Sequence, residues 1–174
     1  MAMDKIKVTQ DTLYEYIQAH DVKLSRLAEL MDRVPEVVIS CFNHNKNQHG
    51  NPRSFNAEHA DLINQALPRL AHELRKCVLK FGSPQVHTSK KGHTYDPALV
   101  EPIKDLGVYL NITAMLQRVL GWSAAKKSSI LSRPTGKLYG NISNVDAVAI
   151  NTEILSIAAV LDSYELEIDN DNQA

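Results

Sequence analysis

The chain has 174 residues, of which 44% are hydrophobic, so it can bury a core without disulfide staples. Its two cysteines, Cys41 and Cys77, lie in apolar helical patterns without paired spacing, which favours reduced thiols and a cytoplasmic protein over a disulfide framework. No export signal and no run of about 18 apolar residues is visible, so we expect no membrane partner.

Charge is distributed unevenly behind a formal net charge of −1. Residues 21–94 carry 11 basic against 7 acidic side chains, whereas residues 95–174 carry 6 against 10. Six of the seven histidines lie between His44 and His93, so the first half gains positive charge below about pH 6.5. A basic first half permits phosphate contacts, although ordinary scatter of surface charge also produces differences of this size.

The first part of the chain is predicted to be helical because its apolar residues recur at intervals of three and four. Thr9 is suited to cap a helix over residues 10–19. A short helix from Leu24 to Met31 follows, and Pro35 suits the first turn of a third helix.

A polar loop over residues 43–53 separates these short helices from a longer one, which Asn56 is suited to cap. Pro68 removes a backbone amide from the longer helix. We therefore expect Pro68 either to kink it or to start another helix over residues 69–80.

The second part of the chain begins with residues 85–95, which read equally well as a linker or as a short hairpin. Four helices are expected after it, near residues 97–109, 112–120, 124–132 and 145–166. A turn at 121–123 and a loop at 133–136 separate them, and the acidic residues 169–174 are expected to form a disordered tail.

One pattern of residues occurs twice. The first occurrence comprises Ile63-Asn64, Leu67, Leu70-Ala71 and Leu74, and the second, 87 residues later, comprises Ile150-Asn151, Ile154, Ile157-Ala158 and Leu161. Upstream, Leu27, Met31 and Cys41-Phe42 match Leu116, Leu120 and Ile130-Leu131 at an offset of 89, so the second copy has a loop two residues shorter. We predict an internal duplication, against the alternative of chance likeness between amphipathic helices.

Two short helices joined by a tight turn, with longer helices behind them, are the layout of a helix-turn-helix unit. In the first copy Leu27-Ala28, Met31-Asp32, Val34 and Val38 resemble the phage-repressor (lambda-repressor-like) type of helix-turn-helix. In the second copy Leu120-Gly121-Trp122-Ser123 looks like the turn of that family, with glycine suited to a left-handed backbone and serine to the helix cap.

The resemblance implies an all-α fold of two tandem lambda-repressor-like units. We place the first unit at residues 1–81 and the second at 97–168. Residues 82–96 then form the linker or short hairpin, and 169–174 the tail.

The resemblance also implies that the third helix of a unit reads bases in the major groove of DNA. That helix begins with Val34 to Ile39, which lacks the Arg, Gln or Asn side chains that match base edges. Polar and basic groups come later, and further basic groups flank the third helix of the second copy. The candidate DNA-binding residues are Ser40, Asn43, His44, Asn45, Lys46, Asn47, Arg53, Lys126, Lys127, Arg133 and Lys137.

One of these candidates conflicts with the alignment of the two copies. Lys127 aligns with Val38, a position that should be buried. Either the register of the second helix-turn-helix differs by one residue, or the second copy has lost the family geometry.

Other chemistries have weaker support. Cys41, His44 and His49 are zinc-ligand types without a convincing fourth ligand, and no nucleophile and base are paired, so we expect no metal, no cofactor and no enzyme activity. The preferred function is a transcriptional regulator that binds double-stranded DNA. The alternative is a protein-interaction module that uses the apolar surface of Val34, Val37 and Ile39 for a partner protein or a homodimer.

Overall fold

The computed structural model describes residues 4–46, 48–79, 87–88, 94–95, 103, 105–131, 142 and 144–168. This described part of the chain is mostly helical, which agrees with the expected all-α class. The chain forms two compact units, residues 1–73 with 157–174, and residues 74–156. Both boundaries fall inside long helices, whereas the sequence suggested a division at residues 82–96.

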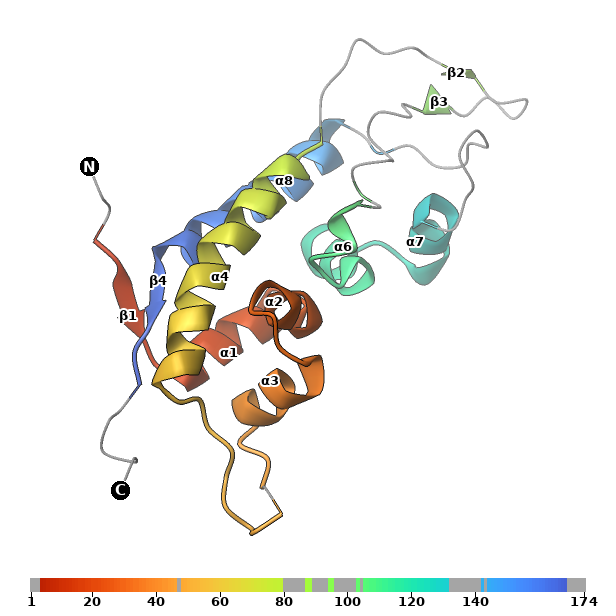
Figure 1. Ribbon diagram of the computed structural model, residues 1–174. Helices are drawn as coiled ribbons and strands as arrows, with labels where there is room; N and C mark the ends of the chain where they lie inside the picture. Colours follow the sequence, from red (N-terminus) through yellow and green to blue (C-terminus); the bar gives the residue numbers. More distant parts are fainter. Residues whose placement is uncertain are drawn as a thin grey trace. The chain divides into compact units, whose positions relative to one another are not determined.

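The first unit contains three short helices and most of a long one, namely α1 (Gln10–Ala19), α2 (Leu24–Leu30), α3 (Pro35–Phe42) and α4 (Ala57–Lys76) (Figure 1). The Thr9 side chain accepts a hydrogen bond from the Thr12 amide at the start of α1, and Pro35 lies in the first turn of α3, as predicted. The Asn56 side chain accepts from the His59 amide at 2.9 Å, which confirms the predicted cap of the long helix.

The long helix α4 runs through Pro68 without ending. The expectation that a separate helix starts after this proline and reaches residue 80 is therefore wrong, because α4 ends at Lys76. Proline removes one helical hydrogen bond, but its fixed φ is compatible with a helix. The fully buried side chains of Leu67 and Leu70 on either side of it hold the helix against the core.

A parallel pair of short strands joins the two ends of the first unit. Strand β1 (Ile6–Val8) pairs with β4 (Tyr164–Leu166), and Figure 1 shows these segments side by side although they are far apart in the sequence. The last predicted helix therefore ends earlier than expected, since α8 (Asn144–Ser163) gives way to β4. Pairing over such a separation leaves no local periodicity to predict it.

The second unit contains α6 (Ile112–Leu120), α7 (Ala124–Leu131) and the first part of α8. Gly121 ends α6 with a left-handed φ of 65°, and the Ser123 hydroxyl accepts from the Lys126 amide at 3.2 Å, as the sequence predicted for this turn. Strands β2 (His87–Thr88) and β3 (Thr94–Tyr95) pair antiparallel, which agrees with the hairpin alternative. The predicted loop at 133–136, the tail at 169–174 and most of the predicted helix near 97–109 lie outside the described residues.

The two sequence offsets also relate the bounds of the helices. Adding 89 to the first and last residue numbers of α3 gives those of α7. Adding 87 to those of α4 gives those of α8. The turns agree as well, because Asp32 (φ 55°) and Gly121 (φ 65°) are both left-handed and lie 89 residues apart.

The repeated asparagine makes the same contact in both units. In the first unit, Asn64 donates to the Leu166 carbonyl at 3.1 Å and accepts from the Leu166 amide at 2.7 Å. In the second unit, Asn151 makes the corresponding bonds to Leu79 at 2.8 and 2.6 Å. Leu79 and Leu166 are themselves 87 residues apart, so Asn64 on α4 holds the segment that follows α8, and Asn151 on α8 holds the segment that follows α4.

Candidate functional site

Helices α2 and α3 of the first unit are joined by a turn of four residues, 31–34. Leu27, Ala28, Met31 and Val38, four of the positions on which the family resemblance depends, are all buried. The Arg33 amide donates a hydrogen bond to the Ala28 carbonyl at 3.0 Å, which stabilises the turn, and α3 begins two residues later at Pro35.

The start of α3 presents apolar and acidic side chains. Val34 is 58% exposed and Val37 is 37% exposed, while Ile39 is only partly exposed. The nearby cation Arg33 is engaged, since its guanidinium lies 2.6 Å from Glu58. With Glu36 exposed as well, this end of the helix offers few groups that bind phosphate or read a base.

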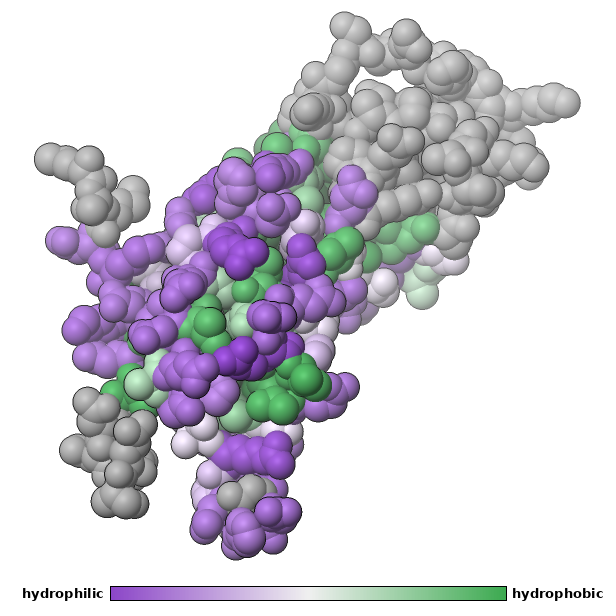
Figure 2. All heavy atoms as spheres, in the orientation of Figure 1, coloured by the Kyte–Doolittle hydropathy of each residue, from purple (hydrophilic) through white to green (hydrophobic). Residues whose placement is uncertain are grey.

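The opposite end of α3 leads into a polar loop, residues 43–56, which we call the amide-rich loop. It holds five asparagines and one glutamine, and no acidic residue occurs between Glu36 and Glu58. Figure 2 shows the loop as a hydrophilic projection at the lower edge of the view. Two contacts fold it back on itself, a bridge between Lys46 and Pro52 and a 2.8 Å bond from the Arg53 amide to the Asn45 carbonyl.

Helix α1 anchors both ends of the amide-rich loop. The Tyr14 hydroxyl donates to Asn43 at 2.5 Å, and His44 Nε2 lies 2.9 Å from Asp11 Oδ1. The Gln10 amide donates to the Cys41 carbonyl at 2.6 Å, and its oxygen accepts from the Phe55 amide at 3.5 Å.

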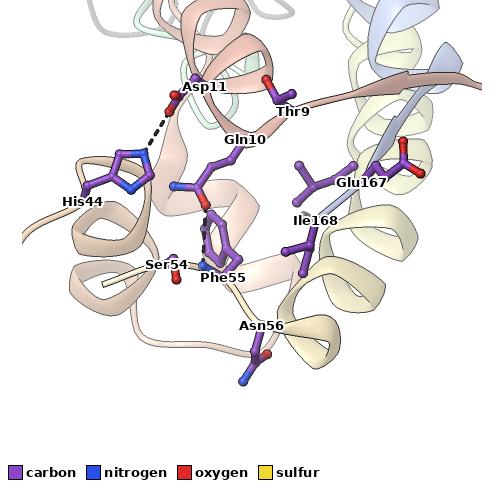
Figure 3. Close-up of a pocket in the computed structure, with 10 residues that line it drawn as sticks. Thr9, Gln10, Asp11, His44, Ser54, Phe55, Asn56, Glu167 and Ile168 are labelled. Carbon is purple, nitrogen blue, oxygen red and sulfur yellow. Dashed lines mark hydrogen bonds and ion pairs between the residues drawn. The ribbon is translucent and has the colours of Figure 1, made fainter. Parts of the chain in front are cut away.

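These α1 side chains were not among the sequence candidates. Their only sequence signal is that three polar groups, Gln10, Asp11 and Tyr14, occur within one turn of a helix. Figure 3 shows Asp11 directed at His44 and Gln10 at Phe55.

A cavity of about 370 Å³ lies where these elements meet. Its walls come from the start of α1, the two ends of the amide-rich loop and the segment after β4, which contributes Glu167 and Ile168 (Figure 3). Glu167 is already paired with Lys7 at 3.3 Å. Among the described residues, no three His, Cys, Asp or Glu side chains lie close enough together to hold a metal ion.

The charge of Arg53 reaches the last turn of α3. Burial raises the pKa of the Cys41 thiol above its usual value, and the positive charge of Arg53 lowers it in part. A cation thus lies near the end of the helix where the backbone dipole is negative, and there it partly offsets the repulsion between that helix end and an anion.

The structure distributes the eleven sequence candidates unevenly. Asn43, His44, Asn45, Lys46 and Arg53 share the exposed surface of the amide-rich loop, and Ser40 is half-buried just before it. Three further candidates, Asn47, Arg133 and Lys137, lie outside the described residues.

The two lysines of α7 differ from each other. Lys126 is exposed, with Nζ 4.6 Å from the centre of the Trp122 ring and 3.8 Å from Asp146. Lys127 is only 7% exposed, and its ammonium group donates to Gln117 at 3.0 Å. Lys127 is therefore buried, as is Val38, which lies 89 residues earlier in the sequence. Its burial disagrees with a phosphate contact, so we leave it out of the candidate surface.

Comparison with known protein families, with curated proteins and with solved structures finds no match to this chain. No helix among the described residues is long and apolar enough to span a membrane.

Proposed function

We propose that this chain is a non-enzymatic protein that binds double-stranded DNA through the amide-rich loop and regulates transcription. The observation that carries the proposal is the composition of that loop, which combines exposed amides with Lys46 and Arg53 and contains no carboxylate. Lysine and arginine neutralise phosphates, and asparagine and glutamine pair with adenine edges.

The anchoring of the loop supports the proposal. Asn43 and His44 are held by Tyr14 and Asp11, so they are fixed before any ligand arrives. Fixing a binding group in advance lowers the entropy cost of association. Docking by the start of α3 is disfavoured, because Glu36 would face phosphates there.

The proposal includes a duplicated, lambda-repressor-like origin for the two halves. Three sets of observations support it, namely the matched bounds of the helices, the matched left-handed turns and the matched asparagine contacts. Action in the cytoplasm belongs to the same proposal and fits the two buried free thiols, Cys41 and Cys77.

The test is fluorescence anisotropy of a labelled mixed-sequence duplex, titrated with the full chain at low and at physiological salt. We expect binding that weakens as salt rises. The variants Lys46→Ala and Arg53→Ala should each bind several-fold more weakly, and each should reduce the slope of log K against log salt by about 0.9 per lost phosphate contact.

The matched control is Lys76→Ala, which removes one exposed positive charge from the end of α4. It should leave both affinity and slope near those of the unchanged protein. Absence of binding at low salt would overturn the proposal. An equal loss in all three variants would show non-specific electrostatics and would remove the loop from the proposed surface.

A protein interface is the second candidate function, and the exposure of Val34 and Val37 at the start of α3 favours it. Apolar side chains in this setting are typical of a docking surface. Val37→Asp should then abolish association with a partner, or of the chain with itself, while circular dichroism remains unchanged. The mass of the protein in solution measures the self-association.

A further inference from the structure

The outward face of α8 carries an apolar stripe within the second unit. Val145 is 79% exposed, Val148 53% and Leu155 48%, and the exposed Thr152 lies between the last two. Successive members are separated by three, four and three residues, which is the spacing of positions a and d in a coiled coil. We call these four residues the α8 seam.

The α8 seam can be buried without leaving a polar group unsatisfied. Its one hydroxyl, that of Thr152, already donates to the Val148 carbonyl at 2.8 Å. The charged residues of α8 nearest the seam are paired within the unit, Asp146 with Lys126 at 3.8 Å and Glu153 with Arg118 at 2.7 Å. Neither desolvation of a free hydroxyl nor an unpaired charge therefore opposes docking on this face.

The corresponding face of α4 has the opposite character. At an offset of 87, the residues that match the α8 seam are Glu58, Asp61, Gln65 and Pro68. The buried positions of the two helices agree, for example Ile63 with Ile150 and Leu67 with Ile154, all fully buried. Only the outward faces differ, so core packing does not account for the apolar residues of the seam.

We propose that the α8 seam packs against the α8 seam of a second copy of this chain. A seam with this spacing fits another helix, and a two-fold interface places each residue opposite the same surface of its partner. The seam is uncharged, and so are the flanking Ala149 and Ser156, so no like charges meet. The formal net charge of −1 adds no long-range repulsion between copies.

The length of the seam sets the expected strength of the dimer. Ten residues separate Val145 from Leu155, which is about 15 Å of helix. Four side chains per copy bury less than a standard interface of about 1,600 Å². We therefore expect a dimer that dissociates on dilution.

The test is sedimentation equilibrium of the full chain over a wide range of concentrations, with four proteins compared. Val148→Glu puts one negative charge in the α8 seam, whereas the control Gln65→Glu puts one on the equivalent face of α4. Val37→Asp disrupts the other exposed apolar patch. The unchanged chain should dimerise, Val148→Glu should weaken dimerisation at least tenfold, and the other two variants should behave like the unchanged chain.

Each other outcome overturns the proposal. A chain that stays monomeric at all concentrations has no such contact. A dimer that survives Val148→Glu, or that is lost in Val37→Asp alone, uses another surface. If Val148→Glu and Gln65→Glu weaken dimerisation equally, the cause is general charge repulsion and not the α8 seam. Circular dichroism of each variant separates loss of the dimer from loss of the fold, and Leu155→Gln, an uncharged change in the same seam, replaces Val148→Glu if that variant unfolds.

Discussion

Helices α4 and α8 have the same length and the same buried register, yet their outer faces have little in common. Ile63, Leu67 and Leu70 on α4 correspond to Ile150, Ile154 and Ile157 on α8, and all six are fully buried. Outside, a charged face on α4 corresponds to the apolar α8 seam. The comparison teaches that in this chain the core fixes the register, whereas the surface is free to acquire separate functions.

The physical reason is the difference in cost between buried and exposed changes. Truncating a buried aliphatic side chain costs roughly 2 to 5 kcal/mol, whereas most surface substitutions stay within about 0.5 kcal/mol. Differences between the halves should therefore collect on the outside. Lys127 and Val38, 89 residues apart, are an exception, since both are buried and they differ in polarity.

The largest expected effect comes from the shared core. Ile63→Ala and Ile150→Ala should each lower the free energy of unfolding by about 3 kcal/mol, because both side chains are fully buried and leave a cavity. Urea denaturation followed by circular dichroism measures both. A cost below about 1 kcal/mol for one of them would break the equivalence of the two cores.

The next effect concerns the matched asparagines. Asn64→Ala and Asn151→Ala should each cost about 2 kcal/mol, because each change leaves the amide and carbonyl of a buried leucine without their side-chain partner. Asn64→Asp keeps the hydrogen-bond acceptor and loses only the donor. It should therefore lower the free energy of unfolding, measured by urea denaturation, by less than Asn64→Ala does. If only one asparagine matters, the two contacts are not equivalent.

Much of the fold could be predicted from local signals. The caps at Thr9 and Asn56, the proline at the start of α3 and the glycine turn after α6 each depend on nearby residues, and each was found where the sequence placed it. The predictions that were wrong concern segments whose structure depends on residues distant in the sequence. Nothing near Leu166 shows that it pairs with β1 and with Asn64, so β4 was predicted as helix.

In the candidate site, too, the sequence predicted the local features and missed the contacts between distant residues. The polar and basic residues of the amide-rich loop were visible as composition, but their anchors on α1 were not. Tyr14 and Asp11 contact Asn43 and His44 across about thirty residues of sequence, and polar residues on a helix surface are too common to indicate such contacts. The repeated asparagine was visible as a pattern, and its role required the structure.

A smaller effect should follow from replacing the buried Lys127 with an apolar residue. Lys127→Leu should raise the free energy of unfolding by about 1 kcal/mol, because an ammonium group held by one amide is replaced by an apolar side chain at a buried position. Gln117 is exposed and can bond water instead. A loss of stability in urea would mean that the Lys127 to Gln117 bond stabilises the contact between α6 and α7.

The smallest effect tests the two left-handed turns. Gly121→Ala should cost about 1 kcal/mol, and the cost should be backbone strain alone, since a Cβ added there meets no atom within 4 Å. The matched change Asp32→Gly relieves the same strain in the first unit, but it also loosens the unfolded chain, so we expect a gain of only about 0.5 kcal/mol. Thermal unfolding of both variants measures the pair. A stabilising Gly121→Ala would show that the second turn does not need its left-handed residue, and the matched geometry of the two turns would then have no common energetic cause.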